Sequence, residues 1–435
     1  MALLKRPKGT EDILPASSAE WISLEDFLRR TALCSGFREI RIPTFEETEL
    51  FSRGVGETTD VVQKEMYTVS ASGDSTFTLR PEGTAGTIRA ILQNGLLNEA
   101  LPQRVYYILS CFRHENTQKG RLREFHQFGV EMAGSANPSA DAEVISLAKQ
   151  IIDDIGVKNV ELRINSIGCP ECRKKYQQAL REYFQPHYDV LCTDCQSRLE
   201  RNPMRLLDCK TETCHTIGKN APEILDYLCE DCNRHFEKLK QYLGLMGIVY
   251  TIDPRIVRGL DYYTKTVFEF VITSYNEKKK QQETLTVCGG GRYDGLIEQL
   301  GGQPTPALGF GMGLERMLMT LHQQGVTLAE PSKCDIYFVP MGEQAEEKAL
   351  QLTAKLRKEG IFALTDVMGR GLRAQMKYAD KIGARFTMVI GDNEIESGEA
   401  VLKNMQTGEK ITMQLDETLP ERFADIEIAD RLARE

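Results

Sequence analysis

The segment between Cys111 and Glu131 constrains the fold of this chain more than any other stretch. It reads CFRHENTQKGRLREFHQFGVE, in which two largely apolar ends flank a polar, basic centre that contains Gly120. Apolar runs separated by a polar stretch with glycine are typical of two antiparallel strands joined by a long loop. The sequence therefore predicts an antiparallel sheet with a basic loop at one end of the hairpin.

The loop of this hairpin carries four cations, which allow two interpretations. Guanidinium groups match phosphate oxygens in bidentate geometry, so these cations could face a polyphosphate. A charged hairpin face exposed to solvent is the alternative, since many surface charges contribute little. The cations are Arg113, Lys119, Arg121 and Arg123.

A second segment, ALGFGMGLERM from Ala307 to Met317, places three glycines before an amphipathic helix. Glycine has no side chain, so the backbone can approach a ligand closely there, while Arg316 projects from the first turn of the helix. A glycine-rich structural turn is the alternative. Because the chain has no GxxxxGK[ST] phosphate loop, an ATP site in it has to be of another kind.

These two segments and FREIRIPTFEETELF, from Phe37 to Phe51, resemble the three ordered motifs of class II aminoacyl-tRNA synthetases, which bind ATP without a phosphate loop. The resemblance implies a homodimer with Pro43 in the dimer-forming motif, and magnesium that is carried by the phosphates of ATP. It implies that an arginine and a glutamate of the hairpin hold the α-phosphate and the adenine, and that a phenylalanine and an arginine stack on the base. The residues assigned to ATP are Arg113, Glu115, Arg121, Phe125 and Arg316.

Four further segments resemble one group within this class, the histidyl-tRNA synthetases. They are PKGTEDILP (Pro7 to Pro15), TLRPEGTAG (Thr78 to Gly86), RGLDYYTKTVFE (Arg258 to Glu269) and GGGRYDGL (Gly289 to Leu296). The resemblance covers essentially the whole chain. It implies activation of L-histidine with ATP, release of pyrophosphate, and transfer of the histidyl group to the terminal adenosine of tRNA(His).

The chemistry of imidazole agrees with this assignment. Neutral imidazole has one donor and one acceptor nitrogen, so a selective pocket needs a carboxylate for one and a hydroxyl for the other, and Glu131 and Tyr263 are the candidates. Such a pocket rejects isosteres that lack these nitrogens without an editing domain. The residues assigned to histidine are Glu82, Gly83, Thr84, Arg113, Gln127, Glu131, Arg258, Tyr262 and Tyr263.

Arg258 and Arg113 are the residues assigned to catalysis. Adenylate formation develops negative charge on the oxygens of the α-phosphorus, and a fixed guanidinium aimed there stabilises the transition state. The resemblance implies that Arg258 does work that other class II synthetases leave to a metal ion. Taken alone, Arg258 would be interpreted as part of a surface salt bridge.

Two other functions fit part of the pattern. A regulatory subunit of the first enzyme of histidine biosynthesis shares the catalytic-domain fold and could bind histidine in the same pocket. A pure sensor is expected to lose Arg258, Arg316 and the C-terminal domain, whereas this chain keeps them. A zinc-dependent nucleic-acid-binding module would leave the three class II motifs unexplained.

A change of pattern near residues 325–333 predicts two domains. Beyond it, strand-like runs alternate with helical stretches, as in a small parallel α/β domain. Before it, a segment rich in Lys, Arg, Glu and Leu predicts a helical insertion. The predicted fold is α/β: a catalytic domain on an antiparallel sheet at 1–325 with the insertion at about 168–243, a linker at 326–333, an anticodon-binding α/β domain at 334–420 and a tail at 421–435.

Three C-x-x-C pairs and one looser cysteine pair lie in the insertion. The two-residue spacing lets both thiolates reach one metal ion, and structural zinc commonly takes four such ligands. A reduced, metal-free insertion with buried thiols is the alternative. His215 and His235 lie nearby and are expected at the surface. The candidate zinc ligands are Cys169, Cys172, Cys192, Cys195, Cys209, Cys214, Cys229 and Cys232.

Four cations of the C-terminal domain recur every three or four residues, which would place them on one helix face. The domain resembles the anticodon-binding domain of the same synthetases, which implies that these cations contact the tRNA backbone. The alternative is a row of cations that is only exposed to solvent.

In the hairpin loop, Asn116 and Thr117 depart from the arginine and proline of many bacterial members. The candidate tRNA-binding residues are Gln118, Lys119, Arg370, Arg373, Lys377 and Lys381.

Composition limits the partners and the cellular compartment that we expect for the chain. A net charge of -9 argues against indiscriminate attraction to phosphate backbones but allows local basic surfaces. No apolar run approaches the roughly 20 residues needed to span a bilayer, and Lys5, Arg6 and Pro7 come too early for a signal peptide. We therefore expect a cytoplasmic protein whose 12 cysteines are reduced thiols or metal ligands.

Overall fold

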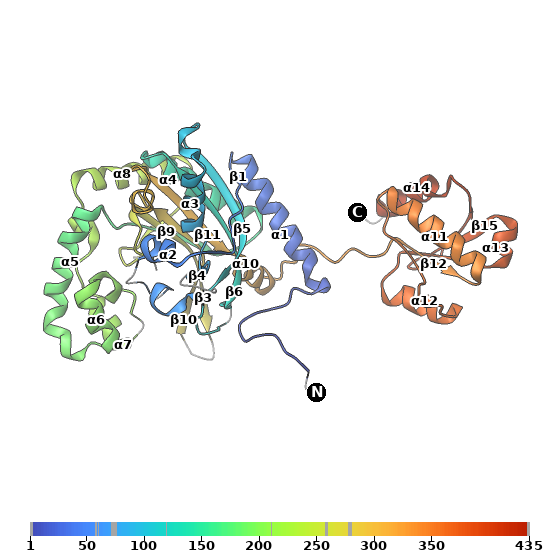
Figure 1. Cartoon of the computed structure of the whole chain (residues 1–435), viewed down its shortest axis with the longest axis horizontal. Coiled ribbons are helices and arrows are strands. Elements are labelled where there is room, and N and C mark those ends of the chain that lie inside the picture. Colours follow the sequence, from blue (N-terminus) through green and yellow to red (C-terminus); the bar gives the residue numbers. More distant parts are fainter. Residues whose placement is uncertain are drawn as a thin grey trace. The chain divides into compact units, whose positions relative to one another are not determined.

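The computed structural model describes residues 3–56, 59, 61–70, 76–118, 120–209, 211–256, 260–276 and 281–432. The chain forms two compact units, Met1–Ala329 and Glu330–Glu435 (Figure 1). Each unit has its own hydrophobic core. Within the described ranges, no helix combines the length and the apolar character that a membrane span requires.

The first unit is built on a sheet with the strand order β1-β5-β6-β11-β10-β9-β7-β8. Neighbouring strands are antiparallel, except that β1 runs parallel to β5 and β7 runs parallel to β8. The antiparallel sheet predicted for the catalytic domain is thus present. Its strands are β1 (Arg38–Glu39), β5 (Gln103–Phe112), β6 (Glu124–Ala133), β7 (Val160–Ser166), β8 (Thr251–Ile252), β9 (Thr264–Asn276), β10 (Gln281–Arg292) and β11 (Ala307–Gly313).

The predicted hairpin is formed by β5 and β6, with Phe112 opposite Glu124 at the loop end. Side chains alternate between the two faces of a strand, so each strand sends one set of residues into the core and the other set to the opposite face. On β6, Phe128, Val130 and Met132 lie in the core. Glu131 lies between them in the chain and therefore points to the opposite face.

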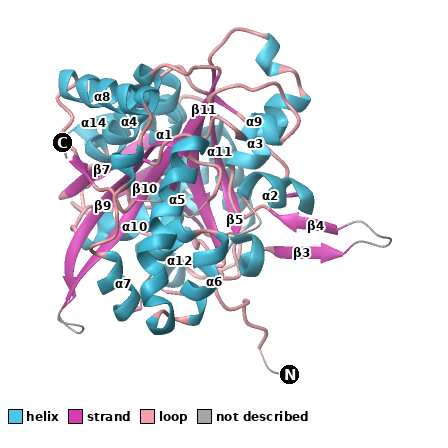
Figure 2. Cartoon of the chain, turned by 90° about the vertical axis from the view of Figure 1, so that its left-hand side faces the viewer, coloured by secondary structure: helices cyan, strands magenta, loops and turns pink. Residues whose placement is uncertain are grey.

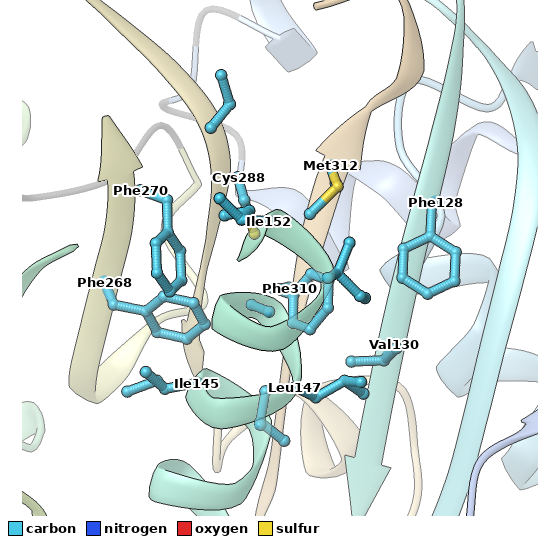
Figure 3. Packing of buried hydrophobic residues seen from close by; sticks show 14 of the residues in the cluster. Phe128, Val130, Ile145, Leu147, Ile152, Phe268, Phe270, Cys288, Phe310 and Met312 are labelled. Atoms are coloured by element: carbon cyan, nitrogen blue, oxygen red, sulfur yellow. The ribbon is translucent and has the colours of Figure 1, made fainter. Parts of the chain in front are cut away.

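The core face of the sheet is covered by α4 (Pro138–Asp154), whose Ile145, Leu147 and Ile152 lie among side chains from β6, β9, β10 and β11 (Figure 3). Phe310 and Met312 of β11 join this core. The glycines that alternate with them in β11 lie on the other face. Packing against α4 thus decides which face of the sheet is left for a ligand.

Further helices and a small sheet complete the first unit outside the insertion. The three-stranded sheet has the order β2-β4-β3 and lies beside α2 (Figure 2). These elements are α1 (Pro15–Cys34), β2 (Phe45–Glu47), α2 (Thr48–Val55), β3 (Tyr67–Ser70), β4 (Thr76–Leu79), α3 (Thr84–Gln93), α9 (Leu296–Gln299) and α10 (Leu314–Gln323).

The insertion between β7 and β9 is helical, as its composition indicates. Its helices are α5 (Pro170–Phe184), α6 (Thr193–Arg201), α7 (Glu212–Gly218) and α8 (Glu230–Leu245). The expectation that His235 is at the surface is wrong: it is 8% exposed, and its Nε2 lies 3.3 Å from Asp141 Oδ1. The reason is tertiary, because α8 packs on α4 and buries this side of the helix. His215 is exposed as expected.

The second unit has a five-stranded sheet with the order β13-β12-β14-β15-β16. The first three strands are parallel, and β15 and β16 form an antiparallel pair whose connection contains Gly408, with a φ of 77°. The elements of this unit are β12 (Ile336–Pro340), α11 (Glu343–Lys358), β13 (Ala363–Thr365), α12 (Leu372–Lys381), β14 (Phe386–Ile390), α13 (Asp392–Ser397), β15 (Glu399–Asn404), β16 (Lys410–Gln414) and α14 (Leu419–Leu432).

The stretch that the sequence assigns to a C-terminal tail, 421–435, lies largely within α14. Phe423 is buried in the core of the second unit, and Arg385 pairs with Glu427 and, at 2.7 Å, with Asp430. These contacts join residues more than 40 positions apart in the chain, with separations of 42 and 45. The helix is therefore part of the α/β unit, for a reason that local sequence does not reveal.

Candidate active site

The glycines of β11 make room for two polar side chains on the open face of the sheet. Gly309 pairs with Glu131 across the strands, and a Cβ at Gly309 would overlap the Glu131 carboxylate. A Cβ at Gly311 would overlap the amide of Gln127. These glycines therefore belong to a strand and not to a turn, which corrects that alternative, and they let the backbone approach the two side chains closely.

Glu131 is the centre of a buried hydrogen-bond network. Its side chain is 1% exposed and accepts hydrogen bonds from Thr84 Oγ1 at 2.7 Å and Tyr107 Oη at 3.0 Å, and from Tyr293 Oη. Burial raises the pKa of Glu131 to about 8, although the three hydroxyl donors oppose this rise. Burial also raises the pKa of Tyr107 and Tyr293 well above the ordinary value, so both hydroxyls keep their protons.

Tyr107 and Tyr293 were not among the residues selected from the sequence. Tyr293 belongs to the segment GGGRYDGL, so the resemblance of this segment could have indicated it. Tyr107 can be recognised only in the structure, where glycines at two positions make room for its ring. A Cβ at either Gly83 or Gly129 would overlap that ring. The geometry of the network thus depends on contacts between β5, β6 and the start of α3.

Glu82 binds the N-terminal end of α3. Its Oε2 accepts a hydrogen bond from Thr84 N at 2.6 Å, and its Oε1 accepts one from Ala85 N at 2.9 Å. Burial raises the pKa of Glu82, against the effect of these two backbone donors. Each carboxylate oxygen has a second lone pair, so Glu82 can still accept a hydrogen bond from an ammonium group.

Gln127 joins the same group through Gly83. The Gly83 backbone N–H donates a hydrogen bond to Gln127 Oε1 at 3.1 Å, which leaves the amide nitrogen of Gln127 on the side of β11. The structure therefore brings together five of the residues assigned to histidine, and these are Glu82, Gly83, Thr84, Gln127 and Glu131.

An aromatic cluster extends the network. Tyr262 and Tyr263 are each 5% exposed, and their ring centroids are 4.8 Å apart. The ring of Tyr262 also contacts the ring of Tyr293 edge-on, with centroids 5.4 Å apart. Because Tyr293 donates to Glu131, the two tyrosines selected from the sequence lie next to the predicted imidazole-binding carboxylate.

Two of the residues selected from the sequence, Arg258 and Lys119, lie outside the described residues. The adjacent Leu260 and Asp261 are described, and the Asp261 backbone N–H donates to Val55 O at 3.1 Å. The role assigned to Arg258 therefore stays a prediction.

Arg113 connects the hairpin to the segment that holds Glu82. Its Nε donates a hydrogen bond to Pro81 O at 2.8 Å, and its guanidinium carbon lies 5.3 Å from the centroid of the Phe125 ring. The hairpin loop is further held by an ion pair between Arg121 and Glu115 at 3.1 Å. The residues assigned to phosphate and adenine thus border the residues assigned to histidine.

Arg316 projects from the first turn of α10, as predicted, toward the hairpin loop. Its Nε donates to Gly120 O at 2.9 Å, and its Nη1 donates to Thr286 O at 2.9 Å. Gly120 has a φ of 72°, and the turn that it forms joins Gln118 to Arg121. Gln118 is exposed in this turn.

The cations of the second unit do not all lie on one helix. Arg370 precedes α12, pairs with Asp366 at 2.7 Å and lies 4.4 Å above the Tyr378 ring, beside a cavity of about 470 Å³. The prediction of four cations on one helix face is wrong for this residue, since Asp366 and the aromatic ring hold it before the helix begins. Arg373, Lys377 and Lys381 are exposed on α12.

Comparisons with known proteins agree with the geometry. A family model described as histidyl-tRNA synthetase matches residues 9–183 and 195–317, and a model described as anticodon binding domain matches residues 335–421. The chain belongs to the histidyl-tRNA synthetase family. The family predicted from the signature segments is thereby confirmed, as is the α/β fold class.

Relatives of this family resemble the chain over nearly its whole length. A histidine–tRNA ligase from Clostridium novyi (strain NT) is 54% identical over 413 residues, which are 95% of this chain and 97% of that protein. One from Acetivibrio thermocellus is 52% identical over 95% of this chain and 98% of that protein. The crystal structure of apo histidyl-tRNA synthetase from S. aureus has a TM-score of 0.82, with 41% identity, and covers 97% of this chain and 100% of that one.

The insertion is where the family model is interrupted, at residues 184–194. The eight cysteines of the insertion lie in two groups of four. One group contains Cys169, Cys172, Cys229 and Cys232, and the other contains Cys192, Cys195, Cys209 and Cys214. Thiols at these positions could hold metal ions, so the structure brings together the residues that the sequence selected as zinc ligands.

Proposed function

We propose that the pocket around Glu131 is where this histidine–tRNA ligase selects its amino acid. The chain activates L-histidine with ATP to histidyl-adenylate and pyrophosphate, and then transfers the histidyl group to the 3′ terminal adenosine of tRNA(His). The buried carboxylate surrounded by hydroxyl donors is the observation that carries this proposal. An imidazole N–H can donate to Glu131, and a tyrosine hydroxyl can donate to the other ring nitrogen.

The backbone groups of the substrate are held at the start of α3. Glu82 and Thr84 accept from the ammonium group of histidine, and Gln127 contacts its ammonium or carboxylate. Tyr262 closes the pocket, and Tyr263 contributes a hydroxyl on the side of the imidazole. This arrangement is supported by the hydrogen bonds that already join Thr84 to Glu82 and Gly83 to Gln127.

ATP binds on the side of the hairpin loop. Arg113 holds the α-phosphate while its Nε remains tied to Pro81, next to Glu82, so activation brings the phosphate close to the histidine carboxylate. Glu115 and Arg121 hold the adenine and the phosphates, and Phe125 and Arg316 stack on the base. Magnesium is carried by the nucleotide's phosphates, because Mg²⁺ retains water and binds few protein ligands in such sites.

Arg258 supplies the second guanidinium at the reacting phosphate, and with Arg113 it stabilises the charge that develops in the transition state. Its position shortly before Tyr262 and Tyr263 supports this assignment, since both of these rings contact Tyr293, which donates to Glu131.

The assembly that we propose is a cytoplasmic homodimer whose tRNA contacts come from both units. Pro43 belongs to the dimer-forming segment, and Arg80, which is 7% exposed, donates to Pro43 O at 2.9 Å and so ties that segment to the histidine side. Arg373, Lys377 and Lys381 contact the tRNA backbone in the second unit, together with Arg370, and Gln118 and Lys119 do so in the hairpin loop. The cofactors are ATP and magnesium, with structural zinc in the insertion.

Aminoacylation of purified tRNA with each amino acid in turn tests the proposed function. We expect charging with histidine alone, and histidine-dependent exchange of pyrophosphate into ATP without tRNA. Glu99→Gln, at an exposed carboxylate, is a matched control that should charge normally. Charging with another amino acid, or exchange that does not depend on histidine, would contradict the proposal.

A further inference from the structure

The two groups of cysteines in the insertion have the dimensions of metal sites. Within each group all four sulfurs lie within 4.8 Å of one another, and the Cys169–Cys172 and Cys192–Cys209 sulfurs are 3.6 and 3.9 Å apart. Four thiolates around a zinc ion, each about 2.3 Å away, have sulfurs about 3.8 Å apart. A disulfide needs sulfurs at about 2.05 Å, and the cysteines are free.

The groups are nested in the chain. The outer group, Cys169, Cys172, Cys229 and Cys232, joins the point where the insertion begins to the point where it returns through α8. The inner group, Cys192, Cys195, Cys209 and Cys214, closes the segment between them. Neither group shares a cysteine with the other, so each can bind one ion independently.

The three C-x-x-C pairs have the same local construction. The first cysteine of each pair is the residue before a helix, at Cys169, Cys192 and Cys229, and the second lies in the first turn. Helices prefer Ser, Thr, Asp or Asn at this position because their side chains cap the backbone, and these cysteines make no such hydrogen bond. Capping therefore does not explain the cysteines.

Backbone N–H groups are directed at the sulfurs. Cys229 N donates to Cys172 Sγ at 3.1 Å, and Cys192 N donates to Cys214 Sγ at 3.3 Å. Donors beside a metal ligand orient it and stabilise its charge. A buried thiol that serves only as a small apolar residue has no need of such donors or of three other sulfurs at close range.

Both groups adjoin the residues that hold the segment Leu260–Tyr263. Arg173, next to Cys172, donates to Tyr263 O at 3.0 Å. Arg205, between Cys195 and Cys209, pairs with Asp261 at 2.9 Å, and Asn202 donates to the same carboxylate at 3.3 Å. A cavity of about 200 Å³ lies at this contact, so hydrogen bonds and not close packing determine its geometry.

We propose that the insertion binds two zinc ions, one in each group of four cysteines, and that together they position Leu260–Tyr263 for histidine. The outer ion fixes the start of α5 and with it Arg173. The inner ion fixes the segment that carries Asn202 and Arg205. The metal sites stand on the cysteine geometry alone, whereas the positioning role rests on the proposed histidine pocket.

Metal analysis of the dialysed full-length protein tests the two sites. We expect about two equivalents of zinc per chain, since each site takes four thiolates. Cys229→Ser and Cys209→Ser should each lose one equivalent, and Cys34→Ser, at an exposed cysteine outside the insertion, should lose none. Less than one equivalent in the unmodified protein would overturn the proposal. Loss of both ions from one single variant would overturn the independence of the sites.

A spectroscopic measurement keeps this test independent of variants that fail to fold. Protein produced with cobalt in place of zinc should show the absorption of tetrahedral thiolate-bound cobalt, at an intensity that corresponds to two ions. Absorption typical of octahedral cobalt with oxygen ligands would overturn the assignment of the cysteines.

Histidine-dependent pyrophosphate exchange tests the positioning role. Loss of the hydrogen bonds to Asp261 should raise the KM for histidine about tenfold, with little change in the KM for ATP. We expect this in Cys209→Ser, and also in Asp261→Asn, which should keep both zinc ions. An unchanged KM in both variants would overturn the positioning role alone. Absence of exchange in the unmodified protein would instead contradict the proposed function, and the metal count would still stand.

Discussion

The guanidinium of Arg292 and the carboxylate of Asp141 form an ion pair in which the two side chains are 0% and 1% exposed. Burial alone would raise the pKa of Asp141, but the charge of Arg292 and hydrogen bonds from Arg292 and His235 lower it to about 2. Arg292 precedes Tyr293, which donates to Glu131. The pair thus ties α4, the insertion helix α8 and the end of β10 to the histidine pocket.

Replacement of this guanidinium should be strongly destabilising. Arg292→Met leaves Asp141 buried without its main partner, so we expect the free energy of unfolding to fall by about 3–5 kcal/mol. Urea unfolding followed by fluorescence of Trp21, the single tryptophan, measures this. The control Arg53→Met removes an exposed pair with Glu49 and should cost less than about 1 kcal/mol. Equal effects would contradict the structural role of the buried pair.

A methyl group added to β11 at Gly309 should displace the Glu131 carboxylate and so disturb the pocket. Gly309→Ala places a Cβ where the Glu131 carboxylate lies, so we expect a loss of about 1–3 kcal/mol in stability and weaker histidine binding. Urea unfolding and calorimetric titration with histidine measure the two effects. Gly244→Ala, with open space around an exposed position in α8, should instead stabilise by about 0.5–1 kcal/mol. Normal histidine binding by the first variant would argue against the close approach.

Replacement of the Glu131 carboxyl should affect histidine and not ATP. In Glu131→Gln, shape is kept but an acceptor oxygen of the buried network is replaced by an amide nitrogen, so we expect kcat/KM for histidine to fall about 10- to 100-fold. Steady-state pyrophosphate exchange with either substrate varied measures this. A parallel fall in kcat/KM for ATP would place Glu131 elsewhere than at the imidazole.

The raised pKa of Glu131 predicts how the free energy of unfolding depends on pH. The carboxyl ionises near pH 4.3 in an unfolded chain and, because burial raises its pKa, at about 8 in the folded protein. The folded state therefore binds the proton more tightly, and this stabilisation is complete below the unfolded pKa and is lost as pH rises through about 8. The slope is at most about 1.4 kcal/mol per pH unit.

Thermal unfolding between about pH 5 and 9 checks this window. Glutamine does not ionise, so the Tm of Glu131→Gln should gain on that of the unmodified protein as pH rises. Parallel curves for the two proteins would show that Glu131 has no raised pKa.

Arg258 should be required for the chemical step. In Arg258→Ala we expect histidine-dependent exchange to fall about 10²- to 10³-fold or more, because a donor to the transition-state charge is removed, while ATP and histidine still bind. Calorimetric titrations measure binding. The neighbouring exposed Arg255, replaced in the same way, should leave exchange unchanged. Near-normal exchange by Arg258→Ala would refute its catalytic assignment.

Local patterns predicted the elements that carry the site. Apolar runs on either side of a polar stretch with glycine indicated β5 and β6, and alternating strand-like and helical runs indicated the α/β pattern of the second unit, because such patterns depend on neighbouring residues alone. The family resemblance selected Glu82, Gln127 and Glu131, which the structure brings together. The same patterns misjudged His235 and Arg370, because the partners of those side chains, Asp141 and Asp366, are tertiary or turn contacts.

By itself, the sequence determined the family, the order of the hairpin, the helical insertion and the α/β unit, and the spacing of the cysteine pairs. Each of these depends on residues that are close together in the chain. Only the tertiary structure decided which cysteines form each group of four and which hydroxyls surround Glu131. The physical reason is distance along the chain. Tyr293 and Glu131 are 162 positions apart, and no local period relates them. Their contact arises because antiparallel pairing of β11 with both β6 and β10 brings Glu131 of β6 near the end of β10, which Tyr293 follows.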